Sequence, residues 1–291
     1  ILPPLNNETW VNYFDLYKKI PQYQILNSEM SLEEFKIIFY WEYFHRILGR
    51  FIGLFFLIPL IYFHFTKKIK SSYIITCYLI FILIFLQGII GWYMVKSGLV
   101  NDVTVSHYRL SLHLSNALII VSAIYWMIIN SKNKTNLIFF NLKDNRVIFL
   151  FLFFLLLLQI LFGAFVSGLD AGKIYQTWPL MGLNYFPDDL QIKSFLDLKE
   201  FSNHSLVQFY HRNLAYFISF YILVLSFWIF RKKETYLFKP VFILIGILII
   251  QIFLGIITLL SNLNIVIALG HQITSVIFIL SALNLYYSAI K

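Results

Sequence analysis

This sequence of 291 residues contains only one cysteine and few charged residues. Its one cysteine, Cys77, lies in an apolar run, which excludes an intrachain disulfide and any Cys-x-x-Cys motif for metal binding or redox chemistry. Charged residues make up 13% of the chain, about half the roughly 25% typical of soluble domains, and 59% of residues are hydrophobic. So few charges could not cover a soluble globule, and this composition also excludes disordered and collagen-like classes. Membrane lipid is therefore the expected surrounding.

The long apolar segments of the chain predict its fold class. A helix needs about 20 mainly apolar residues to cross a bilayer, and only helices or closed barrels can span one. The alternation typical of barrel strands is absent from runs such as FLFLFF at 149–154. The sequence predicts an all-α, polytopic membrane helical bundle. Its seven expected spans lie at about 40–65, 73–95, 109–130, 147–168, 205–230, 239–260 and 267–290.

The net charge of +9 is divided unevenly among the loops. Loops 66–72, 131–146 and 231–238 hold ten Lys and Arg against two acidic residues, whereas segments 1–39 and 169–204 hold most of the acids. By the positive-inside rule the basic loops face the cytoplasm or the mitochondrial matrix. The charge thus reflects topology, not nucleic-acid binding, and either a bacterial inner membrane or a mitochondrial inner membrane fits. Prolines in the two acidic segments predict short helices and turns there.

The chain also resembles itself, with both halves running in the same direction. This parallel sense differs from the inverted repeats of many transporters. Three pairs of segments match: EYFHR at 42–46 with QFYHR at 208–212, GIIG at 88–91 with GIIT at 255–258, and the His and Ser-Ala of 112–123 with those of 270–282, with one gap.

The two halves differ by one helix. The C-terminal half has a span at 147–168 ahead of its acidic segment, whereas nothing comparable precedes 1–39, and the chain begins Ile-Leu-Pro without methionine. We therefore expect two tandem four-helix repeats in which the first helix of the N-terminal half is missing. Residues 1–130 would form the N-terminal half-bundle, and residues 147–291 the C-terminal four-helix half-bundle.

Four histidines occupy equivalent places in the repeat, each at the outer end of a span. One such histidine would usually be an interfacial cap, but four in register argue against that reading, because ionisable groups in membranes are costly. Two histidines on separate helices at one depth can bind a haem iron from both sides. His107 lacks the repeat spacing that His113 keeps, and His64 and His204 have no repeat partner. The expected metal ligands are His45 with His113 and His211 with His271.

Arginines and one carboxylate accompany these histidines. Arginine suits the carboxylate groups of a porphyrin, so we expect propionate contacts from Arg46, Arg50, Arg109 and Arg212. Three residues before its histidine the N-terminal half has Glu42, where the C-terminal half has Gln208. Because only a carboxylate can exchange a proton, catalysis is expected in the N-terminal half, with Glu42 as proton acceptor or electrostatic stabiliser. The alternative is that Glu42 only pairs with Arg46 at i+4.

Five longer motifs resemble those of the haem A synthase family, and the resemblance covers nearly the whole chain. It is closest to the mitochondrial and proteobacterial type, which lacks the outer-loop cysteine pair of other bacterial members. The motifs are FKIIFYWEYFHRILGR at 35–50, GWYMVKSGL at 91–99, SHYRL at 106–110, GAFVSGLDAG at 163–172 and TWPLMG at 177–182.

The resemblance implies an oxidoreductase that acts on a CH group. Such an enzyme oxidises the C8 methyl of haem O to the formyl of haem A through alcohol intermediates, and haem A serves terminal oxidases. By this likeness haem O, the substrate, binds between His45 and His113 with Glu42 at the reacting edge. A cofactor haem b on His211 and His271 carries electrons to an unknown acceptor. The implied partners are haem O and the haem O synthase that supplies it, and homo-oligomerisation stays open.

Two other classes compete with this interpretation. A di-haem electron-transfer protein of the cytochrome b kind would need the same four histidines but not Glu42. A transporter would suit the repeat, yet its parallel sense and the lack of Asp or Glu in the middle of any span disfavour transport.

Overall fold

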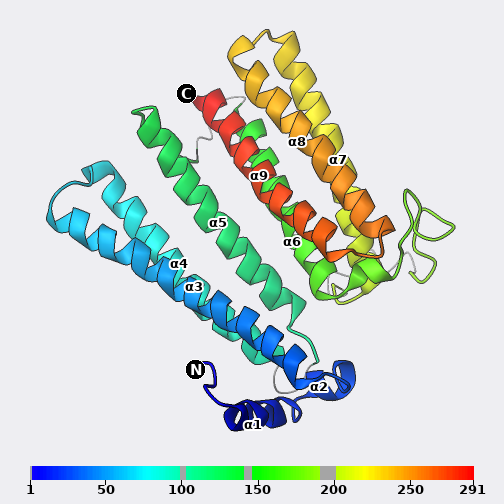
Figure 1. The fold of residues 1–291 in the computed structure, drawn as a ribbon. Helices are drawn as coiled ribbons and strands as arrows, with labels where there is room; N and C mark the ends of the chain where they lie inside the picture. Colours follow the sequence, from blue (N-terminus) through cyan, green and yellow to red (C-terminus); the bar gives the residue numbers. More distant parts are fainter. Residues whose placement is uncertain (1, 99–102, 141–145, 191–200) are drawn as a thin grey trace. The chain divides into compact units, whose positions relative to one another are not determined.

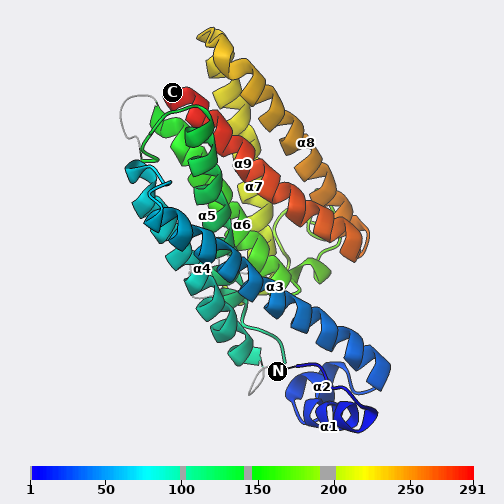
Figure 2. The ribbon, with the colours of Figure 1, turned by 60° about the vertical axis from the view of Figure 1, so that its left-hand side comes forward.

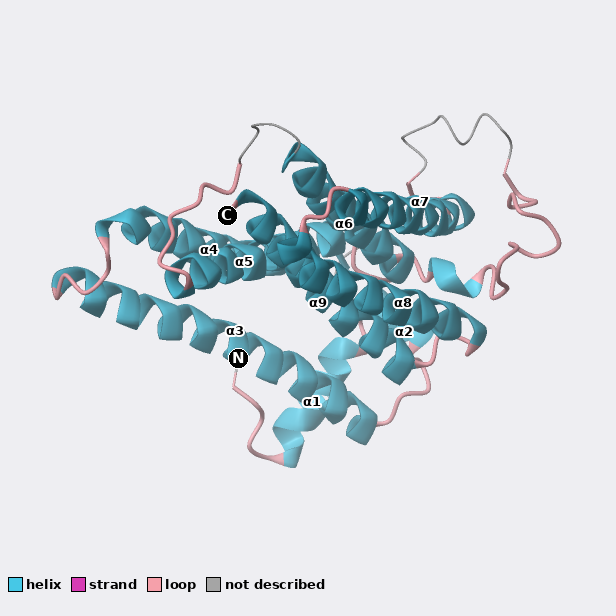
Figure 3. Cartoon of the chain, turned by 90° about the horizontal axis from the view of Figure 1, so that it is seen from above, coloured by secondary structure: helices cyan, strands magenta, loops and turns pink. Residues whose placement is uncertain are grey.

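The computed structural model describes residues 2–98, 103–140, 146–190 and 201–291. Within these ranges the chain consists of helices and loops, without a β-strand (Figure 3). Parts of three predicted loops, 99–102, 141–145 and 191–200, lie outside the described residues.

The seven predicted spans are confirmed as helices that are long and apolar enough to cross a membrane. The chain is thus an all-α, multi-pass membrane protein. The spanning helices are α3 (Leu32–Phe65), α4 (Ser71–Gly98), α5 (His107–Lys132), α6 (Val147–Gly168), α7 (His204–Arg231), α8 (Phe238–Leu260) and α9 (Ile265–Ile290).

Helix α3 begins eight residues before the predicted span because its first turn is capped by polar side chains. The Ser31 hydroxyl accepts a hydrogen bond from the Glu34 amide at 3.3 Å, and the Glu34 carboxylate accepts one from the Ser31 amide at 2.8 Å. This reciprocal pair is a capping box, which satisfies N–H groups that a helix otherwise leaves free. The helix therefore starts in the polar segment ahead of the hydrophobic run.

The acidic N-terminal segment folds into the short helices α1 (Asn7–Tyr17) and α2 (Pro21–Leu26), as its prolines predicted. Trp10 and Phe14 of α1 are buried together with Phe35 of α3. The Trp10 ring lies 5.0 Å from that of Phe39 in an edge-on arrangement, which aromatic pairs favour. An aromatic cluster thus fixes α1 against the first turns of α3.

Contacts divide the chain into two compact units, 1–120 and 121–291. In the second unit α6 packs against α7 and α9, and α8 packs against the same two helices, which closes a four-helix ring (Figures 1 and 2). Its core includes the fully buried side chains Leu206, Ile222, Val241 and Leu283. In the first unit α3 packs against α4 and α1.

The boundary between the units falls inside α5. Past residue 120 this helix packs with the second unit: the Trp126 indole donates a hydrogen bond to the Leu137 carbonyl at 3.1 Å and stacks on Tyr286. The half-bundles 1–130 and 147–291 were defined by the sequence repeat, and they stay a prediction.

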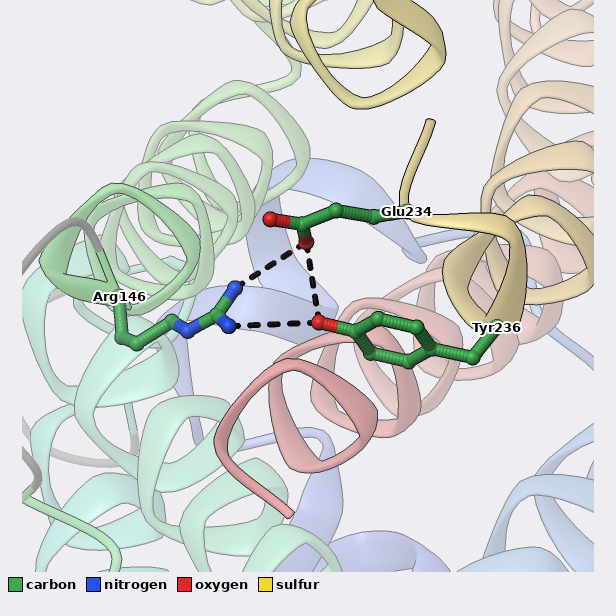
Figure 4. A network of polar contacts seen from close by, with 3 residues as sticks. All are labelled: Arg146, Glu234 and Tyr236. Atoms are coloured by element: carbon green, nitrogen blue, oxygen red, sulfur yellow. Dashed lines mark hydrogen bonds and ion pairs between the residues drawn. The ribbon is translucent and has the colours of Figure 1, made fainter. Parts of the chain in front are cut away.

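A polar network ties the start of α6 to the connection between α7 and α8 (Figure 4). Arg146 forms an ion pair with Glu234 at 3.2 Å and donates a hydrogen bond to the Tyr236 hydroxyl at 3.3 Å. The Tyr236 hydroxyl in turn donates to Glu234 at 3.0 Å. The three groups satisfy one another at the basic end of the bundle.

Breaking this network should lower stability only modestly. We expect Arg146→Gln to reduce the free energy of unfolding by about 1 kcal/mol, the upper value for a partly exposed ion pair. Thermal melting of the purified protein measures this, with Lys232→Gln, an exposed neighbour of the same charge, as the control. Equal melting temperatures for the two variants would show that the network adds nothing.

Candidate functional site

The structure brings the predicted histidines together in two pairs, one in each unit. His211 of α7 and His271 of α9 are partly buried and interact electrostatically. His113 of α5 and His45 of α3 interact in the same way, although His45 is exposed. These pairs are the ones the repeat predicts, and their role as haem ligands stays a prediction.

Three of the histidines meet the preceding long helix in the same way, against a glycine. A Cβ atom built on that glycine would lie about as close to the imidazole as Cβ atoms ever come, so a side chain there would displace the ring. The contacts to His Cε1 are 3.0 Å for Gly91 with His113, 3.1 Å for Gly163 with His211, and 2.9 Å for Gly255 with His271.

A glutamine four residues before each glycine contacts the same histidine. Residues i and i+4 share one helix face, so the amide and the glycine meet one ring together. The Gln87 amide nitrogen lies 3.2 Å from His113 Nε2, and that of Gln159 lies 3.1 Å from His211 Nδ1. The corresponding distance from Gln251 to Nε2 of His271 is 3.4 Å.

Several buried polar atoms at these contacts have no hydrogen-bond partner among the described residues. They are Nδ1 of His113 and His271, and Oε1 of Gln159 and Gln251. Buried polar atoms are nearly always satisfied in native proteins. Unpaired imidazole nitrogens in particular are what a metal centre requires, so both units suit a bound metal-bearing group.

The donor set fits a haem better than a bare metal ion. No group of three or more His, Cys, Asp or Glu side chains gathers for a metal in the described residues. A haem iron needs only axial ligands from the protein, because the porphyrin supplies the others. Two histidines in each unit meet that requirement.

Glu42 and its repeat counterpart Gln208 lie in different surroundings. Glu42 is exposed and forms an ion pair with Arg46 one turn further along α3, so the pairing that was the alternative interpretation is present. Gln208 is buried and donates a hydrogen bond to the Tyr175 carbonyl at 2.9 Å. The titratable position therefore belongs to the first unit.

The four predicted propionate ligands differ in their present contacts. Arg212 donates to three main-chain carbonyls, those of Tyr175, Thr177 and Leu180, at 2.8, 2.9 and 3.2 Å. These residues belong to the stretch 169–190, which we call the outer segment because the predicted topology puts it on the outer side of the membrane. Arg109 donates to the Tyr93 carbonyl at 2.9 Å, and its guanidinium lies 3.8 Å from the Tyr93 ring centroid. Arg50 is exposed and without a polar partner in the described part of the chain. Arg212 thus holds the outer segment in place, and Arg50 is the most available of the four.

The outer segment contains a tyrosine–aspartate hydrogen bond close to the Arg212 contacts. The Tyr175 hydroxyl donates to Asp189 at 2.9 Å, and Asp189 also accepts from the Ser205 hydroxyl at 2.7 Å. Burial, with this hydrogen bond to a carboxylate, raises the pKa of Tyr175 above its ordinary value. The bond exists only while the phenol keeps its proton.

The stability that Tyr175 contributes to the fold should therefore decrease at alkaline pH. Since the folded pKa is raised, the contribution is fully present below the unfolded value of about 10. It is lost as pH rises through the higher folded pKa. We expect Tyr175→Phe to lower the melting temperature by a constant amount up to pH 10 and by a shrinking amount above it. Melting curves across that range test this; a pH-independent difference would contradict it.

Sequence reasoning missed the three glutamines and placed one glycine out of register. The sequence match of GIIG with GIIT puts Gly88 opposite Gly255, but a Cβ on Gly88 would meet nothing within 4 Å, whereas Gly91 meets His113 as Gly255 meets His271. The structure therefore corrects that alignment by three residues. The missed signal is Gln-x-x-x-Gly, which occurs three times in the sequence, at 87–91, 159–163 and 251–255.

Comparison with known proteins matches almost the whole chain. A family model described as cytochrome oxidase assembly protein matches residues 1–283. A Pelagibacter ubique protein named "Heme A synthase" is 46% identical over 287 residues, which are 99% of this chain and 84% of that protein. Proteins of the same name from Rickettsia bellii and Wolbachia pipientis wMel are 39% identical over 295 residues and 40% identical over 287 residues. These two alignments cover 100% and 98% of this chain, and 87% and 80% of the respective relatives.

Proposed function

Because the chain belongs to the haem A synthase family of cytochrome oxidase assembly proteins, we propose that it converts haem O to haem A. The reaction would oxidise the C8 methyl of haem O to a formyl group through alcohol intermediates, which makes the chain an oxidoreductase acting on a CH group. The observation that carries the proposal is the presence of two histidine pairs, only one of which has a carboxylate three residues from a histidine.

His45 and His113 would hold the substrate haem O in the first unit. Glu42 lies one turn before His45 on α3, so its carboxylate would share the substrate side of that helix. Oxidation of a methyl group releases protons, and a carboxylate can accept them where an amide cannot. Arg50 and Arg109 would contact the propionates.

His211 and His271 would hold a haem b in the second unit. The haem b, when bound, would carry one electron at a time. The chain's own contribution is to exclude water through the closed ring of α6 to α9 and to keep the outer segment in place through Arg212. Gln208, which has no proton to exchange, suits a site that binds its haem without reacting.

The same proposal sets the protein in a bacterial or mitochondrial inner membrane. The basic loops would face the cytoplasm or matrix. A haem O synthase would supply the substrate, and an electron acceptor would receive the electrons. Self-association is compatible with the lipid-exposed faces of the helices.

The test is to express the chain in a host that makes haem O but no haem A. Non-covalent haems are extracted from the purified protein and identified by chromatography with mass detection. Haem A or its alcohol precursor, absent from cells with the empty vector, would support the enzyme. Haem b alone would favour the alternative function, a di-haem electron-transfer protein of the cytochrome b kind.

A further inference from the structure

Three glycine–glutamine pairs recur in both units, and haem ligation alone does not explain them. Each pair lies on one helix face and meets one histidine of the following long helix. We call them cradles. They are Gln87 with Gly91 around His113, Gln159 with Gly163 around His211, and Gln251 with Gly255 around His271.

The glycine of each cradle acts by leaving out a side chain. Other glycines of the same helices, such as Gly88 of α4 and Gly246 of α8, face open space, where a Cβ would meet nothing within 4 Å. Alanine is about 1 kcal/mol more favourable than glycine inside a helix. A glycine kept against the ring therefore gives up helix stability for close contact with the imidazole.

The glutamine of each cradle contacts the histidine ring, and two of the three also hold the histidine main chain. The amide groups of Gln87 and Gln159 each donate to the main-chain carbonyl of their histidine at 3.0 Å. Gln87 is itself fixed, because Asn116 donates to its Oε1 at 2.7 Å and to the Leu83 carbonyl at 3.1 Å. The amides of Gln87 and Gln159 are thus anchored to helix backbone next to the ring that they contact, whereas the Gln251 amide meets His271 at the ring, 3.4 Å from Nε2.

Every Gln-x-x-x-Gly motif in the sequence belongs to one of the three cradles. Gln-x-x-x-Gly occurs three times in the 291 residues, and all three occurrences face a histidine assigned to iron. Chance contacts between glutamine and histidine would not come with a glycine at the same spacing each time. A shared role for the three pairs follows.

We propose that the cradles are positioning devices that fix the rotation of the imidazole rings and so set the ligand geometry offered to the haem iron. This inference rests on the proposed function. Outer-shell groups that orient a metal-bound histidine typically change metal affinity 10- to 100-fold when removed. The cradles do this with a side-chain amide and a missing side chain.

The test uses the full chain, purified with its haem, and compares matched variants. Gly255→Ala fills a cradle, whereas Gly246→Ala adds the same methyl group to the same helix in open space. Gln251→Leu removes an amide, whereas Gln272→Leu removes one that is exposed beside His271. The readouts are the electron paramagnetic resonance spectrum of the oxidised haem, its midpoint potential, and carbon monoxide binding to the reduced haem.

We expect Gly255→Ala and Gln251→Leu to shift the low-spin signal and the midpoint potential, and to weaken haem retention about 10- to 100-fold. The two controls should match the wild type. If the spectra and midpoint potentials were unchanged in both cradle variants, or changed equally in the controls, the positioning role of the cradles would be wrong. The proposed function would be unaffected by that result. A wild type purified without any haem would overturn the proposed function and the cradles with it.

Discussion

Glu42→Gln is expected to slow haem A formation about 10²- to 10⁴-fold, the contribution typical of a positioned general acid or base. The substitution keeps the size of the side chain and copies into the first unit the residue that the second unit has at position 208. Because the histidines are untouched, haem O should still bind. Extracted haems, quantified over time after induction, measure the rate.

Two further variants separate catalysis from ion pairing. Arg46→Gln breaks the same ion pair but keeps the carboxylate, so it should cost far less than Glu42→Gln. Glu33→Gln removes another paired glutamate of α3, whose partner is Lys36 at 2.7 Å, and should leave the rate unchanged. If Glu42→Gln and Arg46→Gln were equally slow, Glu42 would be a partner of Arg46 and no more.

Removal of a histidine of the second unit should give the other large effect. We expect His211→Ala and His271→Ala to weaken retention of haem b by at least about 100-fold, since each variant would lose a proposed direct iron ligand and not only an outer-shell partner. Haem O should remain bound to the first unit. The haem content per protein, with the identity of the extracted haems, measures both effects.

A second histidine of α7 serves as the control for His211→Ala. His204 lies exposed at the start of α7, two turns before His211, and His204→Ala should retain haem b. His113→Ala should lose haem O instead. Loss of haem b in His113→Ala but not in His271→Ala would reverse the assignment of the two units.

The sequence predicts the spans well because their signal is local. Seven long apolar runs can be read without knowing what packs against them, and each is a helix in the structure. The start of α3 was missed because the capping box of Ser31 and Glu34 is a polar signal outside the apolar run. Hydropathy shows where a helix is buried in lipid and not where its hydrogen bonding begins.

The site was predictable only as far as the repeat extends. His45, His113, His211 and His271 follow from register, and the structure brings them together in the expected pairs. Arg212 was interpreted from its neighbour His211 alone, yet its contacts are carbonyls more than 30 residues away in sequence. The Gln-x-x-x-Gly pattern of the three pairs can be read in the sequence, but the histidine that each pair meets lies on the facing helix and is seen only in the structure.

The closed ring of α6 to α9 has a consequence for the order of biosynthesis. Its last contact, between α6 and α9, can form only after α9 has been made, and α9 contains His271. Helices α6 and α7 can enter the bilayer together beforehand, with Arg146 and Glu234 joining their basic ends. The pair His211 and His271 is therefore incomplete until all four helices have left the ribosome, so a haem b held by this pair, as proposed, would be loaded after translation of this region and not during it.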